Sequence, residues 1–443
     1  MATTYKKEGL EAKPFIHYLP IVIACIMFAF VPTAMQTSCN GIFLPELGKD
    51  YGVPTSQISI YLTIGNLTAA VFAPIIGQLL ARFDVRVITS VMLLGAAGSF
   101  FSLSISTSLV QVWISGALMT GFCTSFVGLV NPTILTRWFK DLKGTMIGIA
   151  AAFTGFGGVV FIPIGQSIIT MIGYREAYLA YAILILILCL PGSLFALRSH
   201  PHDKGMLPFM SEKRKAGLLH EKKPGMSTWT VDPSVAMKNP AFYLLGLATG
   251  ILGWCLLLNP HFPTYVGTLE AAGVNAIITG AMLATLVSGS QGVGKLVLGA
   301  LSDKSPMKTI VFAGCLGVFS VLAIWWGPTT LAMPLGAIAF GFFFATSAVL
   351  MPMLAGSVFG TGENYSIILG RSQTITKLIT APGAMVWPFL AENAGGWGTV
   401  FGCVAILIIL VVLCSWLVRY FGSKIPHIPV DAEGNVISWF LKQ

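Results

Sequence analysis

The sequence predicts an all-α membrane protein whose twelve transmembrane helices form two pseudo-symmetric halves of six helices each. The chain has 443 residues, of which 55% are hydrophobic and 10% are charged, whereas soluble proteins have about 25% charged residues. Apolar runs long enough to cross a hydrocarbon core of about 30 Å recur along nearly the whole chain. One long polar interruption lies near the middle, and short segments of the first half recur in the second.

The apolar runs between turn and charge signals give the expected helices in order. They cover residues 15–43, 57–81, 85–106, 109–138, 144–171, 175–197, 240–265, 275–301, 309–327, 331–358, 366–391 and 397–421. The polar interruption carries the charged clusters Glu212–Lys215 and His220–Lys223. We therefore expect an N-terminal six-helix half at 1–197, a linker at 198–239 and a C-terminal six-helix half at 240–443.

The distribution of basic residues between the loops predicts the orientation in the membrane. The N-terminus, the even-numbered loops, the linker and the C-terminus carry 21 lysines and arginines, and the opposite loops carry two, Lys49 and Arg175. Because cytoplasmic loops are enriched in basic residues, both termini and the linker are expected in the cytoplasm of a multi-pass protein of the plasma (inner) membrane. The net charge of +9 reflects this bias and does not indicate a nucleic-acid partner.

The two halves repeat each other at a nearly constant offset. The segment Gly77–Arg86 after the second run corresponds to Gly299–Lys308 after the eighth, 222 residues later, and Pro132 corresponds to Pro352, 220 residues later. Parallel six-helix repeats place the binding site of a transporter between the halves, near mid-membrane and alternately open to each side.

Three basic residues lie within the expected helices, namely Lys295, Arg371 and Lys377, whereas all seventeen acids lie in loops, tails or helix ends. An ionised side chain at the bilayer centre costs roughly 2.5–3.5 kcal/mol and normally faces a cavity and a partner. Without an acid at that depth, the expected partner is a carboxylate anion, which forms charge-assisted hydrogen bonds with lysine. The alternative is that Lys295, and more so Arg371, extends to the cytoplasmic surface.

The repeated segments 77–86 and 299–308 resemble the loop signature G-x-L-a-D-r-x-G-r-r of the major facilitator superfamily. The second copy keeps the aspartate as Asp303, whereas the first has Ala81 there. Two further stretches, Arg137–Gly144 and Lys238–Tyr243, are similar to the oxalate:formate antiporter and monocarboxylate porter branch. This resemblance implies a monomeric secondary transporter that works by alternating access. Secondary or gating roles are expected for Arg82, Arg86, Asp303, Arg137, Arg371 and His261.

The same resemblance implies a substrate site. Lys295 and Lys377 correspond to the two cations of the oxalate transporter, and Gln36 to a glutamine of its pocket wall. Where that pocket has tyrosines and tryptophans, this chain has Thr37, Phe156, Phe344, Ala348 and Thr374, and the loss of phenol and indole groups implies a roomier, less polar cavity for a monocarboxylate with an apolar body. Gln291 replaces the aspartate of proton symporters, so anion exchange, symport and uniport stay open.

Other functions are weighed against this prediction. A proton-driven exporter of hydrophobic drugs has the same fold, but it requires a carboxylate within the membrane, and the sequence offers none there. His261 is either a structural histidine or a proton relay, and Gly155–Gly158 is expected to allow close helix packing. The eight cysteines have no paired spacing, and no catalytic or metal-binding pattern stands out, so we expect no enzyme activity, cofactor or metal.

Overall fold

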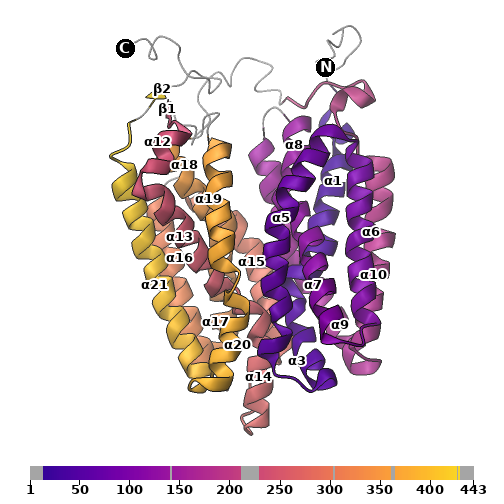
Figure 1. Cartoon of the computed structure of the whole chain (residues 1–443), viewed down its shortest axis with the longest axis vertical. Coiled ribbons are helices and arrows are strands. Elements are labelled where there is room, and N and C mark those ends of the chain that lie inside the picture. The colour runs from indigo at the N-terminus through magenta and orange to yellow at the C-terminus, as the bar shows by residue number, and fades with distance from the viewer. Residues whose placement is uncertain are drawn as a thin grey trace.

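The computed structural model describes residues 13–139, 142–210, 229–302, 305–360, 365–426 and 428–429. Two helical bundles stand side by side, with both termini at the same end (Figure 1). The first bundle is built from the N-terminal part of the chain and the second from the C-terminal part. Each has its own buried apolar cluster, which runs from Tyr18 to Met206 in the first bundle, with Ala284 and Ala384 added to it, and from Val231 to Ile425 in the second.

The N-terminal bundle contains, in order, η1 Phe15–His17, α1 Leu19–Phe28, η2 Ala29–Thr33, α2 Ala34–Ser38, α3 Asn40–Tyr51, α4 Thr55–Ile58, α5 Ile60–Arg82, α6 Val85–Ser104, α7 Leu109–Ser125, η3 Phe126–Val130, α8 Asn131–Trp138, α9 Lys143–Met171, α10 Tyr174–Pro191 and η4 Gly192–Ala196. The short helix η5, Pro201–Lys204, follows at the start of the linker.

The C-terminal bundle contains α12 Pro233–Lys238, α13 Pro240–Leu256, η6 Asn259–His261, α14 Phe262–Ala271, α15 Gly280–Ser302, α16 Pro306–Trp326, α17 Ala332–Phe344, α18 Thr346–Phe359, α19 Tyr365–Thr380, α20 Gly383–Asn393 and α21 Gly396–Gly422. A two-residue antiparallel ladder joins β1, Trp229–Thr230, to β2, Ile428–Pro429, and so links the end of the linker to the C-terminal tail.

The helices follow the predicted order of twelve spans, with differences at the ends. Eleven segments of the described chain are long and apolar enough to cross a membrane. The predicted eleventh span consists instead of α19 and α20, which are separated at Ala381 and Pro382. The seventh span continues as α14 to Ala271, beyond its apolar run, and the first continues as α3 to Tyr51.

Spans one and four each contain a π-turn, and side chains join the two spans where the helices are irregular. Pro32 lies inside η2 and cannot donate a backbone hydrogen bond. Thr33 Oγ1 donates to the Cys123 carbonyl oxygen at 2.8 Å, and Asn131 Nδ2 donates to that of Cys25 at 2.8 Å. These bonds satisfy polar groups that would be costly to leave unpaired inside a membrane, and they hold span one against span four.

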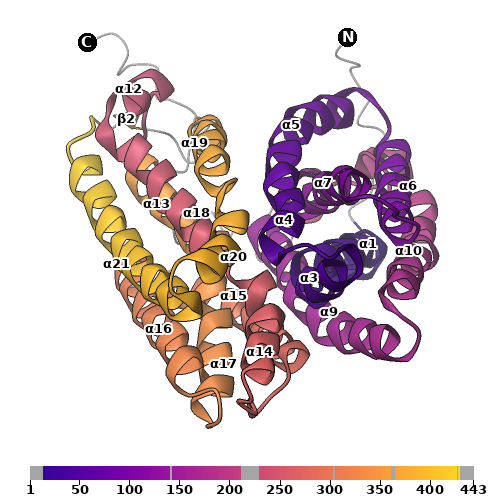
Figure 2. The ribbon, with the colours of Figure 1, turned by 60° about the horizontal axis from the view of Figure 1, so that its bottom comes forward.

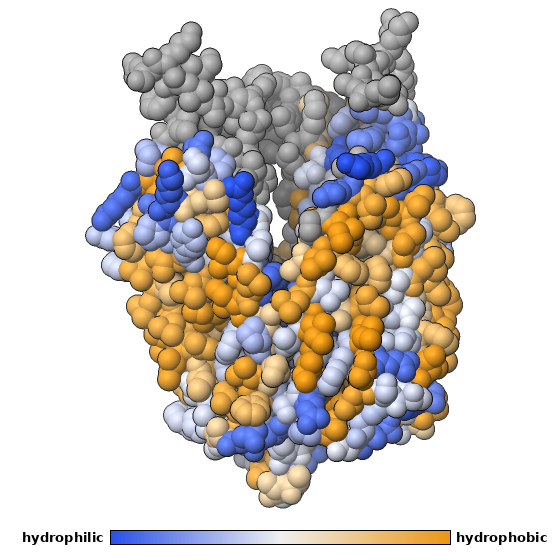
Figure 3. All heavy atoms as spheres, viewed as in Figure 1, coloured by the Kyte–Doolittle hydropathy of each residue, from blue (hydrophilic) through white to orange (hydrophobic). Residues whose placement is uncertain are grey.

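The surface has the distribution of a membrane protein. On the face that Figure 3 shows, an apolar belt crosses the middle of both bundles, and polar residues lie at the two ends. Exposed side chains of the belt include Val71, Val91, Ile187, Phe312 and Ile406. The chain is therefore a multi-pass membrane protein.

The bundles touch at the end away from the termini and along α9 and α15. In Figure 2, which brings this end forward, α3 meets α14 and α4 meets α20. Ser56 donates to the Glu392 carboxylate through its backbone nitrogen at 3.2 Å and its Oγ at 2.5 Å. A cleft between the bundles opens toward the end that carries the termini (Figure 3). In the predicted orientation, the cleft faces the cytoplasm.

A labelling experiment tests that orientation. A cysteine introduced at Glu270, which is exposed at the end of α14, is expected to react with a membrane-impermeant maleimide added to intact cells, because α14 lies at the end opposite the termini. A cysteine placed in the sequence run Lys213–Lys215 is expected to react only after permeabilisation. The reverse labelling pattern would contradict the predicted cytoplasmic position of the linker.

Candidate functional site

Lys295 connects the two bundles. It lies on α15, and its Nζ donates to the Ala151 carbonyl oxygen at 3.0 Å and to Thr154 Oγ1 at 2.6 Å, both on α9. Thr154 Oγ1 donates its own proton to the Ala151 carbonyl oxygen at 2.8 Å, which leaves its lone pairs for the ammonium group. Thr154 is buried and Lys295 is half-buried. The lysine thus has neutral partners from the other bundle, which the sequence argument did not include.

Two glycines of α9 allow this close contact. A Cβ atom on Gly155 would lie 2.5 Å from both the backbone nitrogen of Gly292 and the carbonyl oxygen of Ser288, on α15. A Cβ atom on Gly158 would lie 2.5 Å from Ser288 Cβ. The close helix packing predicted for this glycine run is confirmed, and it brings the α9 backbone within reach of the Lys295 side chain.

Lys377 lies on α19, three residues after Thr374 and therefore on the same helix face. A different face of α19 packs on α13, where Thr376 Oγ1 donates to the Gly246 carbonyl oxygen at 3.4 Å. The Lys377 side chain is half-buried, and it has no hydrogen bond or ion pair with any residue that the structure describes. Among the described residues it is thus a basic side chain without a partner, on a helix of the predicted eleventh span.

Gln36 and Thr37 lie on α2, in the irregular first span. Gln36 is buried and its Nε2 donates to Thr120 Oγ1 at 3.2 Å, whereas its Oε1 lacks a partner in the described part of the chain. Thr37 is half-buried, and its hydroxyl donates to the Thr33 carbonyl oxygen at 2.8 Å. Like Thr154, Thr37 donates its own proton within its span and keeps its lone pairs as acceptors.

Phe156 and Gln291 lie at the contact between α9 and α15. The Phe156 ring is half-buried and lies 3.2 Å from where a Cβ atom on Gly292 would be. Gln291 is buried, with 7% of its surface exposed, one turn before Lys295. The structure therefore brings these two predicted residues together with Lys295.

The remaining predicted wall residues lie on other helices. Phe344 ends α17, is half-buried and packs against the C-terminal core. Ala348 on α18 and Thr374 on α19 are exposed. Thr374 and Lys377 share one face of α19.

Asp84 has a local role at the start of α6. It caps the helix by accepting from the Arg86 backbone nitrogen at 2.9 Å, and it pairs with the Arg86 guanidinium at 2.6 Å. The hydrogen bond from that guanidinium holds the pKa of the Asp84 carboxyl below its usual range. Ser199 Oγ also donates to Asp84, at 3.3 Å, so the start of the linker is attached to this loop.

The other loop residues are distributed along the same end. Arg137 Nη2 donates to the Leu80 carbonyl oxygen at 3.0 Å, which joins α8 to the end of α5. Arg82 is exposed. Asp303 lies outside the described residues.

Arg371 and His261 lie away from the Lys295 contact. Arg371 is exposed near the start of α19, and its Nη1 donates to Met237 Sδ at 3.0 Å. His261 is fully buried in η6, with its Nε2 2.9 Å from the Ala384 carbonyl oxygen. Its Nδ1 has no partner among the described residues.

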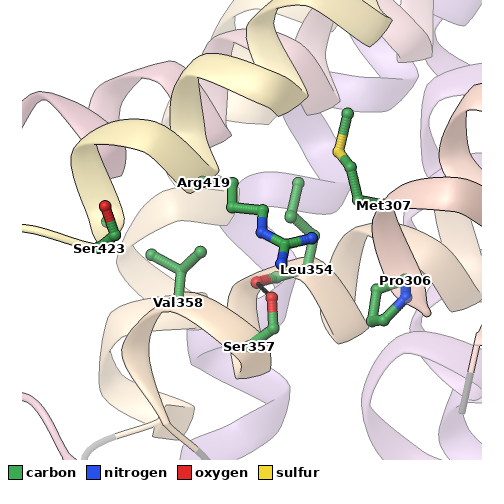
Figure 4. A pocket seen from close by; sticks show the side chains of 8 residues that line it. Pro306, Met307, Leu354, Ser357, Val358, Arg419 and Ser423 are labelled. Atoms are coloured by element: carbon green, nitrogen blue, oxygen red, sulfur yellow. Dashed lines mark hydrogen bonds between the residues drawn. The ribbon is translucent and has the colours of Figure 1, made fainter. Parts of the chain in front are cut away.

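A surface pocket of about 300 Å³ lies within the C-terminal bundle, between the ends of α16, α18 and α21. Figure 4 shows the Arg419 side chain extending over it, beside Leu354 and Ser357. The Ser357 and Ser423 hydroxyls donate to backbone carbonyl oxygens at 2.8 Å each. Because this pocket is not between the bundles, it is not a candidate for an alternating-access site.

Sequence reasoning missed the acceptors of Lys295. Ala151, Thr154, Gly155 and Gly158 fall on one face of a helix, by their spacing of three and four residues. This spacing could have indicated the contact, because Thr154 lies on the same helix face as Gly155 and Gly158, whose small size allows a second helix to pack closely there. Within the described ranges, no group of three or more His, Cys, Asp or Glu side chains could hold a metal ion.

Two bundles that meet around a cleft form the architecture of a secondary membrane transporter. The sequence model described as "Major Facilitator Superfamily" matches residues 26–368, and the chain belongs to this family. It is therefore a transporter and not an enzyme. The predicted family and fold class are confirmed.

Individual relatives are distant. The uncharacterized MFS-type transporter YhjX of Escherichia coli (strain K12) is 22% identical over 74% of this chain and 78% of its own length. Monocarboxylate transporter 12 of Rattus norvegicus is 23% identical over 95% of this chain and 90% of its own. Among solved structures, a mutant of the nucleoside transporter NupG superposes with a TM-score of 0.71 at 12% identity, covering 90% of this chain and 99% of its own, which supports the fold.

Proposed function

We propose that this protein carries an organic carboxylate anion across the plasma membrane, and that Lys295 and Lys377 hold the carboxylate in the cleft between the bundles. The observation that carries the proposal is Lys377, a cation within a span that has no partner among the described residues. An ammonium group in that setting requires an acceptor, and the expected helices contain no acid at its depth. An anionic cargo supplies the missing acceptor.

The contacts of Lys295 are compatible with the same role. Its two acceptors on α9 are neutral, so no protein carboxylate among the described residues compensates a positive charge on this side chain. Gln36 on the opposite bundle has an Oε1 without a partner in the described chain, which accepts from a donor such as a lysine ammonium group or a hydroxyl of the cargo and not from the carboxylate itself. Cations from the C-terminal bundle and polar groups from the N-terminal bundle could contact one cargo together, as alternating access between two halves requires.

Two further features support a monocarboxylate with an apolar body. The alignment with monocarboxylate transporter 12 covers 95% of this chain. The side chains at 37, 348 and 374 are small, and Phe156 and Phe344 add apolar surface. Gln291 cannot exchange a proton next to Lys295, which favours anion exchange or symport without a carboxylate relay.

A competition experiment in proteoliposomes tests the size of the cargo. Benzoate and phenylacetate are expected to compete for uptake better than oxalate, because a wide and apolar cavity gains from burial of the ring whereas a small dianion gains nothing from it. The measurement is the concentration of each acid that halves uptake of a labelled monocarboxylate. Benzyl alcohol serves as the uncharged control and is expected not to compete. Oxalate as the strongest competitor would contradict the assignment of the wall residues, and absence of protein-dependent uptake of any labelled carboxylate would contradict the carboxylate function.

A further inference from the structure

Among the described residues, Lys295 is the only charged side chain that donates hydrogen bonds from one bundle to the other, and it donates two, both to α9. Ala151 and Thr154 lie one turn apart on α9 and point their oxygens at one ammonium group, at 3.0 and 2.6 Å. The Thr154 hydroxyl donates its proton to the Ala151 carbonyl oxygen, so toward Lys295 it acts only as an acceptor. The N-terminal bundle thus presents a pair of neutral acceptors to the cation of the C-terminal bundle.

These two acceptors bind the Lys295 ammonium group more strongly than an apolar side chain would and less strongly than a carboxylate would. A carboxylate in their place would form an ion pair that a cargo carboxylate could not readily displace, whereas an apolar side chain would leave the half-buried ammonium group poorly satisfied. A hydroxyl and a carbonyl satisfy the lysine but bind it less strongly than a carboxylate does, because charge-assisted hydrogen bonds between two ions are stronger. A carboxylate that reaches Lys295 can therefore replace them.

We propose that Thr154 is a positioning residue for Lys295: together with the Ala151 carbonyl it holds the ammonium group in the empty carrier, and the cargo must displace it. This inference rests on the proposed carboxylate function. Displacement exchanges a bond between the bundles for a bond to the cargo, so cargo binding weakens the contact of α9 with α15 in the form with an open cleft. Thr154 in this way links occupancy of the site to the interface that must rearrange during transport.

The test is Thr154→Val, which removes the hydroxyl and keeps the shape of the side chain. Because the Thr154 hydroxyl no longer competes with the cargo for the Lys295 ammonium group, the variant is expected to bind phenylacetate roughly fivefold more tightly. This factor corresponds to the free energy of one net hydrogen bond. The measurement is the phenylacetate Kd of the purified full-length protein, with the melting temperature recorded without and with saturating phenylacetate. The variant is expected to melt lower than wild type when empty and equally when saturated, because only the empty form uses the Thr154 bond.

Two matched variants control for the substitution itself. Thr154→Ser keeps the hydroxyl and is expected to restore the wild-type Kd. Thr170→Val makes the same change on the same helix, where the Thr170 hydroxyl donates only to carbonyl oxygens of its own helix, and it is expected to leave the Kd unchanged.

The outcomes separate the two proposals. If wild type binds phenylacetate and Thr154→Val binds it equally or more weakly, the displacement is wrong while the carboxylate function stands. Equal losses of melting temperature in the empty and saturated states would also contradict it, since they would indicate a structural role only. If wild type binds none of benzoate, phenylacetate and oxalate, the carboxylate function itself is contradicted, and the displacement falls with it.

Discussion

Lys377→Gln is expected to abolish uptake of carboxylate anions into proteoliposomes. Glutamine keeps the length and the hydrogen-bonding capacity of the side chain but removes the positive charge, and the charge is what compensates a carboxylate that leaves water. Because Lys377 has no protein partner in the described part of the structure, its neutralisation leaves no group unpaired. Expression and the melting temperature of the empty protein are therefore expected to stay near wild type or to rise.

Related variants define what the charge contributes. Lys377→Arg is expected to keep partial activity, because the charge remains while the donor geometry changes. Arg371→Gln is expected to do less harm than Lys377→Gln, because Arg371 is exposed and donates to Met237 near the start of α19. Transport at wild-type rates by both Lys295→Gln and Lys377→Gln would show that these cations are not the anion site.

Gly155→Ala is expected to destabilise the protein and to reduce transport strongly. The added Cβ would lie 2.5 Å from the Gly292 nitrogen and from the Ser288 carbonyl oxygen. Both are backbone atoms, so α9 and α15 must separate to admit it. Overpacking of this kind costs about 1–3 kcal/mol, and the separation also withdraws Ala151 and Thr154 from Lys295. The measurements are the melting temperature in detergent and the initial uptake rate.

Gly148→Ala provides the matched control on the same helix. A Cβ on Gly148 would meet no atom within 4 Å, and alanine is favoured over glycine in a helix by about 1 kcal/mol. This variant is expected to be as stable as wild type or slightly more so. Equal behaviour of the two alanine variants would contradict the requirement for close packing of α9 on α15.

The spans could be predicted because apolar length and loop charge are properties of short stretches of sequence. The ends of the spans were harder to predict, because a helix can continue beyond its apolar run, as α14 does to Ala271. The separation of α19 from α20 at Ala381 and Pro382 depends on a proline, which lacks a backbone donor but does not by itself show where a helix breaks.

For the candidate site, the lysines stood out because charge is rare in apolar spans. The acceptors of Lys295 did not stand out, because they belong to the other half of the chain. Thr154 in particular has the same sequence appearance as Thr37, whose hydroxyl bonds only its own helix at Thr33. Hydroxyls in helices commonly do this, so the inter-bundle role of Thr154 became visible only once α9 was placed against α15.

If Lys295 and Lys377 form the anion site as proposed, the unbalanced charge of the cleft makes the carrier responsive to voltage. With Lys295 and Lys377 both as ammonium groups, the empty site is positive, and one elementary charge moved through 100 mV changes the free energy by about 2.3 kcal/mol. In the predicted orientation, an inside-negative membrane potential would therefore favour the empty carrier with its cleft open to the cytoplasm. One bound carboxylate would cancel half of that charge. The membrane potential would then act less strongly on the loaded carrier than on the empty one.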